Sequence, residues 1–389
     1  MHVPFDPLDK KSVLPIKFRN MGKSFSGSSP SPFVGRFGYP EINLGILAPP
    51  EISDNAWELD APKYWASNNY TISDIVSLRS SLINSSQKVN IRDKEKLLSI
   101  AQQVGMASRP VDLEINLKEK PIFRLNSDSY LAPRGPNARL ENASITSNPH
   151  IDSKVDKVCD DTDLKASEAL IYLYSRGFDE NFLSKLLSVG SLGIGKNRKL
   201  VPSRWSITAS DDTIGKNLIQ GIKENSIAEH QMYYGSYLGN HYFMLFFSGT
   251  WKYELFEAFI GSSTINPDYM TDYEPYDGRK KYAEQCAGGY YSVRLAIAEK
   301  LKEMKKQASA IAVRIITKEY NTPLGVWVTR EASRKALSAR PLTFGSKELM
   351  LQYLASFLQS KFGCVISGML SKSRLLQELK QKKIMDYAA

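Results

Sequence analysis

The sequence predicts an α+β fold with a mixed sheet and long amphipathic helices. The first observation is a helical stripe within 284–307, where residues 286, 290, 293, 297, 301 and 304 are apolar or aromatic and lie three or four positions apart. The second is a set of strand-like runs rich in apolar and aromatic residues, at 241–247, 251–260 and 310–317. Helices and strands therefore follow one another along the second half of the chain, which favours a mixed fold.

Composition restricts the class of protein before any motif is considered. The chain has 389 residues, of which 42% are hydrophobic and 24% charged, so it is neither disordered, collagenous nor a coiled coil. Its three cysteines lie far apart, which excludes a CxxC zinc site and a disulfide framework and favours a reducing compartment. No signal peptide or membrane-spanning run is evident. We therefore expect a soluble cytoplasmic protein.

The first half of the chain reads as less regular than the second. Residues 1–60 are rich in Pro, Gly and Ser and predict an irregular segment packed on the body. Helices are expected from Ser73 and over 94–104, and alternating apolar residues predict a strand over 111–117. Turn formers without periodicity at 132–163 suggest a subdivision of the main α/β body, which we place at 61–370.

The second half contains clearer element boundaries. Two short helices are expected at 164–174 and 180–189. Because only Ser-Gly-Thr separates 241–247 from 251–260, these two runs predict strands that pair with each other. Residues 324–328 look strand-like, and Ser346 is an expected N-cap of a helix through Lys361. Residues 371–389 then form a short mobile C-terminal tail.

Positive charge is concentrated at the C-terminal end of the sequence. The net charge of the chain is +10. Residues 290–389 contain 18 Lys and Arg against 7 Asp and Glu, whereas the preceding 289 residues contain 33 against 34. Clustered cations suit a polyanion, so we expect this C-terminal third to contact nucleic acid. The alternative is a set of solvated helix faces.

The segment 200–216, LVPSRWSITASDDTIGK, carries the densest set of candidate ligand-binding side chains. It offers cations, hydroxyl groups, a stacking ring and a carboxylate, as a phosphate, nucleotide or metal–phosphate site requires. The candidates are Arg204, Trp205, Ser206, Thr208, Asp212, Thr213 and Lys216. In the alternative interpretation, Asp211 or Asp212 caps a helix that starts near Thr213. In a strand these adjacent carboxylates would point to opposite faces.

Other loops supply further candidate cations. Arg36 lies between glycines in SPFVGRFGYP, and Arg134 lies in APRGP, where the backbone can approach a ligand closely. Arg279 follows Asp272, Glu274 and Asp277 in a cluster that either binds a cation or pairs internally. The sequence identifies no cofactor and no metal site.

Two further motifs have weaker claims to function. Gly190–Lys196 matches the first part of a phosphate-binding P-loop, but Asn197 replaces the required Ser or Thr, so we interpret it as a glycine-rich turn. Among the histidines, His230 and His241 lie near tyrosines and could share a pocket. No serine or cysteine has the context of a nucleophile elbow, so a hydrolase triad is not supported.

The last nine residues, QKKIMDYAA, have the spacing of a sliding-clamp interaction peptide. Gln381, Ile384 and Tyr387 stand at positions one, four and seven, so that one tight helical turn would bring the aliphatic and aromatic side chains together. Many such peptides carry a second aromatic residue where this chain has Ala388, which predicts weaker binding. The alternative is a frayed end of the preceding helix.

Five blocks in order resemble the archaeal Nre family of DNA repair proteins. They are SPFVGRFGYPEINLGILAPP, LVPSRWSITASDDTIGK, YLGNHYFMLFF with GTWKYELFEAF, GGYYSVRLAIAEKL, and LGVWVTREASRKAL. The resemblance implies a role in the response to DNA damage and recruitment by the replicative sliding clamp, PCNA. A cysteine-rich N-terminal stretch that occurs in some members is absent here, since no cysteine precedes Cys159.

The sequence thus favours a clamp-tethered DNA repair factor whose basic C-terminal third contacts nucleic acid. One alternative is an enzyme that processes a nucleotide or a phosphodiester at residues 200–216, assisted by Arg36, Arg134 or Arg279. Another is an adaptor without DNA contact. Convergence of Arg204, Trp205 and Asp212 with Arg36 or Arg134 on one cleft would support the enzyme.

Overall fold

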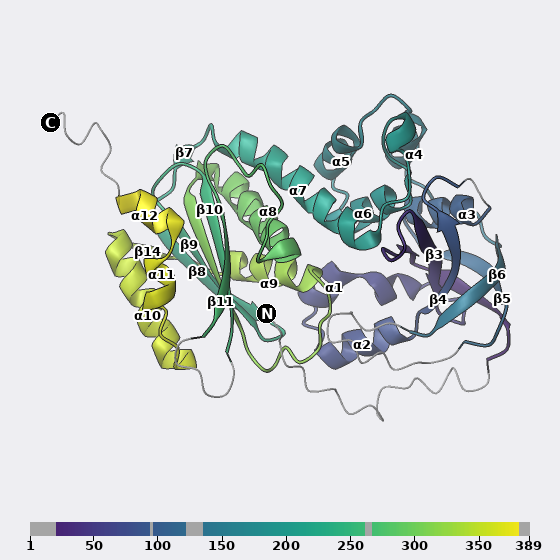
Figure 1. Cartoon of the computed structure of the whole chain (residues 1–389), viewed down its shortest axis with the longest axis horizontal. Coiled ribbons are helices and arrows are strands. Elements are labelled where there is room, and N and C mark those ends of the chain that lie inside the picture. Colours follow the sequence, from purple (N-terminus) through teal and green to yellow (C-terminus); the bar gives the residue numbers. More distant parts are fainter. Residues whose placement is uncertain (1–20, 94–95, 122–134, 261–266, 381–389) are drawn as a thin grey trace. The chain divides into compact units, whose positions relative to one another are not determined.

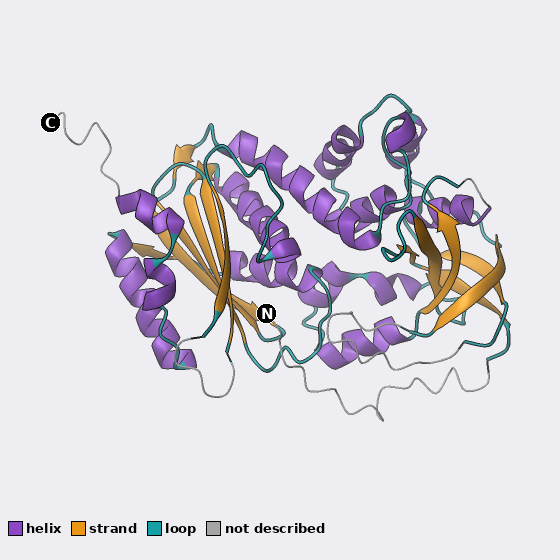
Figure 2. Ribbon diagram, in the orientation of Figure 1, coloured by secondary structure: helices purple, strands orange, loops and turns teal. Residues whose placement is uncertain are grey.

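The computed structural model describes residues 21–93, 96–121, 135–260 and 267–380, and these fold as two compact units. The N-terminal unit contains the described residues up to Ile214 together with Thr322–Leu324. The C-terminal unit contains the other described residues from Gly215 onward. Figures 1 and 2 show that each unit has its own sheet, in agreement with the expected α+β class. The division falls at 214/215, inside a helix, and not in the turn-rich segment 132–163.

A six-stranded sheet with the order β1-β5-β6-β4-β3-β2 forms the centre of the N-terminal unit. Its strands are β1 (Ser24–Ser29), β2 (Ser31–Val34), β3 (Glu41–Ala48), β4 (Ile83–Asn90), β5 (Val111–Leu117) and β6 (Asn137–Ile145). Neighbours are antiparallel except β4 and β6, which are parallel over three residue pairs. The alternation that predicts a strand over 111–117 is confirmed, because every second side chain of β5 is buried.

Within the described residues, seven α-helices accompany this sheet. They are α1 (Pro62–Ser67), α2 (Ile72–Ser80), α3 (Lys96–Met106), α4 (Ser153–Asp160), α5 (Ala166–Ser175), α6 (Glu180–Ser188) and α7 (Ser203–Ile222), the last of which continues into the C-terminal unit. Helix α3 adds Leu97, Ile100 and Val104 to the core formed by the inner face of the sheet. The side chain of Thr71 and that of Asp74 form a capping box at the start of α2.

The proline- and serine-rich N-terminal segment is more regular than the sequence predicts. Residues 24–48 contain β1, β2 and β3, so the expected extended conformation is present but the irregularity is not. Strands of this composition are possible because serine hydroxyls and backbone N–H groups find hydrogen-bond acceptors in neighbouring segments. The Ser29 hydroxyl donates to Leu47 O over 2.8 Å, and the backbone N–H of Ser28 donates to Glu51 O over 3.2 Å. Because these strands contain many serines, they lack the alternation of apolar and polar residues by which a strand is recognised in a sequence.

The C-terminal unit contains a second six-stranded sheet, with the order β11-β10-β13-β9-β8-β14. Its strands are β8 (His230–Tyr237), β9 (Asn240–Phe247), β10 (Lys252–Phe259), β11 (Tyr269–Glu274), β13 (Ser309–Ile316) and β14 (Leu342–Phe344), and a separate small sheet joins β7 (Ser226–Ile227) to β12 (Lys306–Gln307). Strand β13 lies between β9 and β10, antiparallel to the first and parallel to the second. The predicted pairing of β9 with β10 is therefore wrong.

Two helical layers cover the opposite faces of this sheet, as Figure 1 shows. Helices α8 (Ala287–Met304) and α9 (Trp327–Ser338) lie on one face, and α10 (Lys347–Phe362), α11 (Ser367–Ser371) and α12 (Arg374–Lys380) lie on the other. The expected cap of α10 is confirmed, since the Ser346 hydroxyl accepts the N–H of Leu349 over 3.2 Å. The strand expected at 324–328 is wrong, because these residues lead into α9.

The predicted tail begins later than residue 371. Helix α12 is held against β10 by the buried carboxylate of Glu254, which accepts the Ser373 hydroxyl over 2.5 Å and the N–H groups of Arg374 and Leu375 over 3.1 Å each. Glu378 of α12 also pairs with Lys252 over 2.5 Å. Residues 371–380 are thus part of the folded unit, and the clamp-type peptide lies outside the described residues.

Candidate nucleic-acid interface

Most of the segment 200–216 is neither loop nor strand, because residues 203–216 form the first part of helix α7. Asp211 and Asp212 lie inside the helix and about 100° apart around its axis, so neither the opposite-face arrangement nor the capping role applies. The low helix propensity of the serines and threonines obscures this helix in the sequence. Two of their hydroxyls donate within the helix: Ser206 donates to Ser203 O over 2.9 Å, and Thr208 to Arg204 O over 3.4 Å.

This helix separates the cations that a single phosphate site would need. Arg204 and Lys216 are twelve residues apart, which corresponds to about 18 Å along the axis. Thr213 and the half-buried Asp212 lie towards the Lys216 end, whereas Trp205 lies beside Arg204. The candidates of the segment 200–216 therefore do not converge on one phosphate. The Arg204 end meets the predicted loop that carries Arg36, since the Tyr39 and Trp205 rings are in contact.

Ser203 fixes the start of α7 beside the end of β2. Its hydroxyl accepts the backbone N–H of Val34 over 3.0 Å and lies 3.2 Å from the hydroxyl of Ser188 on α6. The Ser188 hydroxyl in turn donates to Val201 O over 2.8 Å. Because Val34 directly precedes the loop 35–40, these bonds bring the loop and the helix start together.

The loop and the helix start present three exposed aromatic rings. Phe37 is 71% exposed, Tyr39 41% and Trp205 46%. The ring centroids of Tyr39 and Trp205 are 5.4 Å apart with an interplanar angle of 50°. Gly38, whose φ is +82°, gives the loop its turn, and the N–H of Glu41 donates back to Gly38 O over 2.8 Å. Large exposed rings in such a group are unusual for a surface without a partner.

Two cations flank these rings. The guanidinium of Arg36 lies 4.8 Å from the centroid of the Phe37 ring. Arg204 is exposed next to Trp205 in α7. Within the part of the chain that the structure describes, neither arginine forms an ion pair. We call Arg36, Phe37, Tyr39, Arg204 and Trp205 the aromatic platform, which joins two of the predicted sites. Phe37 and Tyr39 were not predicted, although both lie beside Arg36 in the sequence.

The acidic cluster around Arg279 is structural. The Asp272 carboxylate accepts the N–H groups of Glu284, Gln285 and Cys286, over 3.1, 2.9 and 2.7 Å, ahead of helix α8. It also pairs with Arg279 over 2.8 Å. Glu274 pairs with Arg294 over 2.7 Å, so the internal-pairing alternative holds for both of these carboxylates. Among the described residues no group of His, Cys, Asp and Glu is arranged to hold a metal ion.

Buried ion pairs take up part of the C-terminal basic excess. Arg294 and Glu274 are both almost fully buried, and Arg314 pairs with Glu257 over 2.5 Å on the same face of the sheet. Both glutamates precede residue 290, so the charge count of 290–389 includes the two arginines but not their partners. The buried arginines add nothing to a basic surface. Among residues 290–380, eight cations are exposed: Lys302, Lys305, Lys318, Arg340, Lys361, Lys372, Arg374 and Lys380.

The remaining candidates behave as follows. His241 shares a hydrogen bond with the Tyr234 hydroxyl over 2.9 Å, whereas His230 accepts the N–H of Ser248, so the two histidines do not share one site.

Gly190–Lys196 forms the expected turn, which includes a short 3-10 helix. Burial raises the pKa of the Cys159 thiol to about 12, which leaves it unreactive at neutral pH. Arg134, Gln381, Ile384 and Tyr387 lie outside the described residues.

Comparison with known proteins identifies the family. The family model described as "Archaeal Nre, N-terminal" matches residues 9–266, and "Archaeal Nre, C-terminal" matches residues 274–387. DNA repair protein NreA of Haloferax volcanii is 38% identical over 337 residues, which cover 82% of this chain and 80% of that protein. The chain belongs to the archaeal Nre family.

Further Nre relatives agree with this result. DNA repair protein NreB of Archaeoglobus fulgidus is 34% identical over 365 residues, with 92% of this chain and 90% of that protein covered. DNA repair protein NreA of the same organism is 36% identical over 326 residues. No solved structure matches the chain. None of the described helices is long and apolar enough to cross a bilayer.

The boundary between the two Nre family models does not separate the two compact units. The gap between the models covers residues 267–273 and thus most of β11, the strand that follows β10. These strands are antiparallel neighbours, with Tyr253 opposite Glu274. The C-terminal unit of this chain therefore contains residues from both family models, and the helix α7 marks the structural division instead.

Proposed function

We propose that this Nre chain acts in DNA repair by binding single-stranded nucleic acid on the aromatic platform. The relatives that support the role are themselves named DNA repair proteins. The observation that carries the proposal is the pair Tyr39 and Trp205, exposed together beside Arg36 and Arg204. Exposed rings stack on unpaired bases of any sequence, and arginines beside them attract the phosphates.

Single strands fit this surface better than intact duplex. In a duplex the faces of the bases are already stacked, so exposed rings gain little from them, whereas an unpaired base offers a free face. A repair factor meets such strands wherever damage has been excised or replication has stalled. The exposed cations of residues 290–380 add a second expected contact with the nucleic-acid backbone.

A nucleotide-processing enzyme has less support. Its site was expected at residues 200–216, but the spacing of Arg204 and Lys216 along α7 prevents them from holding one phosphate. The three described cysteines are buried. We therefore favour a binding role over a catalytic one.

We further propose that the sliding clamp, PCNA, recruits the protein through Gln381, Ile384 and Tyr387. The peptide directly follows α12, which Glu254 and Glu378 hold on the C-terminal unit. A short peptide that follows an anchored helix can reach a clamp while the rest of the protein stays on nearby DNA, which raises its local concentration there.

Two measurements test these proposals separately. Titration of the clamp with the wild-type chain and with the double variant Gln381→Ala, Tyr387→Ala should give much weaker binding for the variant, and equal affinities would refute the clamp peptide. Binding of a fluorescent oligo(dT) should weaken steeply as salt increases. An affinity that does not depend on salt, or no binding at all, would leave the adaptor as the better account.

A further inference from the structure

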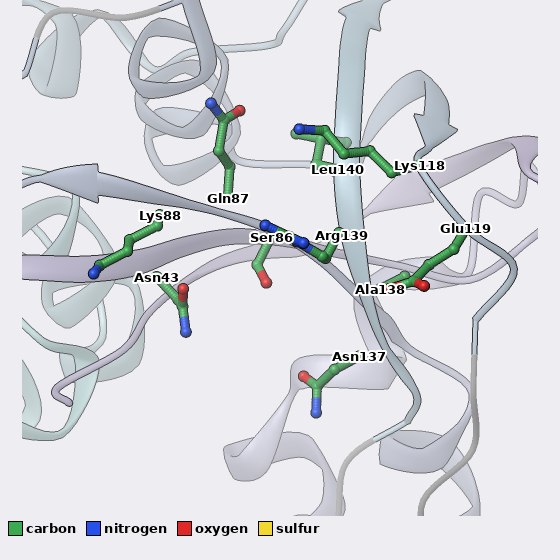
Figure 3. A pocket seen from close by; sticks show the side chains of 10 residues that line it. All are labelled: Asn43, Ser86, Gln87, Lys88, Lys118, Glu119, Asn137, Ala138, Arg139 and Leu140. Atoms are coloured by element: carbon green, nitrogen blue, oxygen red, sulfur yellow. The ribbon is translucent and has the colours of Figure 1, made fainter. Parts of the chain in front are cut away.

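A polar groove opens in the N-terminal unit where two parallel strands diverge. β4 and β6 pair only at Asn84–Asn137, Ser85–Ala138 and Ser86–Arg139. Beyond these pairs β6 turns towards β5, and the register of that pairing shifts between Asn116 and Leu117. The resulting pocket has a volume of about 330 Å³ and lies between β3, β4, β6 and the end of β5 (Figure 3).

Three cations from three segments line this groove. Lys88 comes from β4, Lys118 follows β5, and Arg139 comes from β6, and all three are exposed. None of them forms an ion pair with another residue of the described ranges. Glu119 is the one carboxylate among the lining residues, so the groove carries a net positive charge of two. An excess of like charges held together in this way favours a bound anion.

The remaining lining residues indicate the chemistry of that anion. Asn43, Gln87 and Asn137 contribute side-chain amides, which bind phosphate oxygens or sugar hydroxyls. The lining contains no aromatic side chain, so nothing there can stack on a base. The groove thus suits a phosphate ester but not a nucleobase.

Strand β3 links the groove to the aromatic platform. Asn43 of the groove accepts the N–H of Gly35 over 2.8 Å, and Gly35 directly precedes Arg36. A Cβ atom at Gly35 would lie 3.5 Å from the Cβ of Asn43, so both positions face the same side of the sheet. Because Gly35 has no side chain, nothing at this position blocks the path from the groove towards the platform loop.

We infer that this groove binds the phosphodiester backbone of the strand whose bases stack on the aromatic platform. The inference rests on the proposed single-strand binding and divides the work between two sites. The platform takes bases, and Lys88, Lys118 and Arg139 take phosphates. Affinity for a strand without bases then depends on the groove and not on the rings of the platform.

The test compares three variants of the full-length chain by fluorescence anisotropy. The groove variant is Lys88→Glu, Arg139→Glu, and the platform variant is Phe37→Ala, Trp205→Ala. The control variant, Lys63→Glu, Lys157→Glu, makes the same change in net charge at exposed positions on α1 and α4. The probes are oligo(dT) and an abasic oligonucleotide of equal length. Circular dichroism verifies that each variant is folded.

The groove variant should bind both probes at least tenfold more weakly than the control. Its slope of log K against log salt should fall by about 1.4, since each lost single-strand phosphate contact contributes about 0.7. The platform variant should lose affinity for oligo(dT) but retain its affinity for the abasic strand. A groove variant that matches the control in affinity and slope would overturn the inference, while the loss of oligo(dT) binding in the platform variant would still uphold the proposed function.

A second arm distinguishes a polynucleotide from a free nucleotide. Isothermal titration with dTMP and with inorganic pyrophosphate should give no binding at concentrations at which oligo(dT) saturates the protein. If dTMP binds tightly, and the groove variant abolishes this while oligo(dT) binding stays unchanged, the groove is a mononucleotide site and the inference is wrong.

Discussion

The indole ring of Trp205 lies 5.4 Å from the phenol ring of Tyr39, centroid to centroid, although 165 residues separate them in the sequence. The bond from the Val34 N–H to the Ser203 hydroxyl places the two segments side by side. Both rings remain largely exposed, so their contact does not serve to fill a core. This arrangement leads directly to the first prediction.

Replacing Trp205 with alanine should weaken the binding of single-stranded DNA. Stacking of one base on an aromatic side chain contributes about 1–3 kcal/mol, so we expect a loss of roughly five- to 150-fold. Trp57→Ala is a matched control, because Trp57 is similarly exposed in the same unit but lies outside the platform. Equal losses for the two variants in a filter-binding or anisotropy assay would contradict the role of the platform.

Replacing Glu274 with glutamine should destabilise the C-terminal unit strongly. Its carboxylate accepts hydrogen bonds from Arg294 over 2.7 Å and from the Tyr290 hydroxyl over 2.6 Å in a buried setting. Burial, reinforced by the negative charge of Glu274, raises the pKa of Tyr290, which therefore stays a donor. Breaking a buried ion pair by removing the charge of one partner costs about 3–5 kcal/mol.

Urea denaturation measures this cost. Glu303→Gln serves as the control. Glu303 pairs with Lys300 on the exposed surface of α8, the helix that carries Arg294, and this pair should contribute at most about 1 kcal/mol. If Glu274→Gln lowers the free energy of unfolding by no more than Glu303→Gln does, the buried pair is not needed for stability.

Asp272→Ala should lower the melting temperature, whereas Asp277→Ala should not. Asp272 satisfies three backbone N–H groups ahead of α8 and pairs with Arg279, so its loss should cost about 2–5 kcal/mol. Asp277 is exposed in the adjoining loop. Added Ca²⁺ should leave the melting temperature of the wild type unchanged. A calcium-dependent increase that Asp272→Ala abolishes would revive the cation-binding alternative.

Stability should decrease as pH falls below about 6.5, in part through His241. Burial, and then the nearby charge of Lys361, lower the pKa of His241 in the folded state, while Glu319 opposes this shift. At a pH between the ordinary pKa of 6.5 and the lowered pKa of the folded state, the unfolded chain binds more protons than the folded chain. A fall in pH therefore lowers the free energy of unfolding. The stability that a neutral His241 provides is therefore present above pH 6.5 and lost below it.

The measurement is the urea midpoint at pH 7.5, 6.5 and 5.5 for the wild type and His241→Gln. The variant should show a shallower fall, because one of the groups that resist protonation is gone. His230→Gln is an independent comparison, since burial also lowers the pKa of His230 at another position in the sheet. The same fall in the wild type and in His241→Gln would refute the contribution of His241.

Local signals in the sequence were sufficient for several elements. The hydroxyl of Ser346 and the apolar stripe within 284–307 predict α10 and α8 correctly, because capping and helical periodicity act within a few residues. Strand pairing is different. The short connection between β9 and β10 suggests a hairpin, yet β13 inserts between them, and its affinity for both strands comes from buried side chains far along the chain.

The candidate site was predictable only in part, for the same reason. Arg36, Arg204 and Trp205 stand out in the sequence by residue type and by their glycine- and proline-rich surroundings. The groove does not, because Lys88, Lys118 and Arg139 are isolated in sequence and meet only through cross-strand pairing. The C-terminal basic excess misled in the opposite direction, since Arg294 and Arg314 contribute to its count but lie inside the protein.

The insertion of β13 between β9 and β10 has a consequence for the chain as it leaves the ribosome. β9 and β10 emerge first and expose apolar and aromatic side chains. In the folded protein the facing edges of these two strands do not pair with each other but with β13. Their common neighbour ends at Ile316, after the whole of α8 has been translated. The nascent C-terminal unit is therefore exposed to mispairing during this interval, and a chaperone or slow local translation would protect it there.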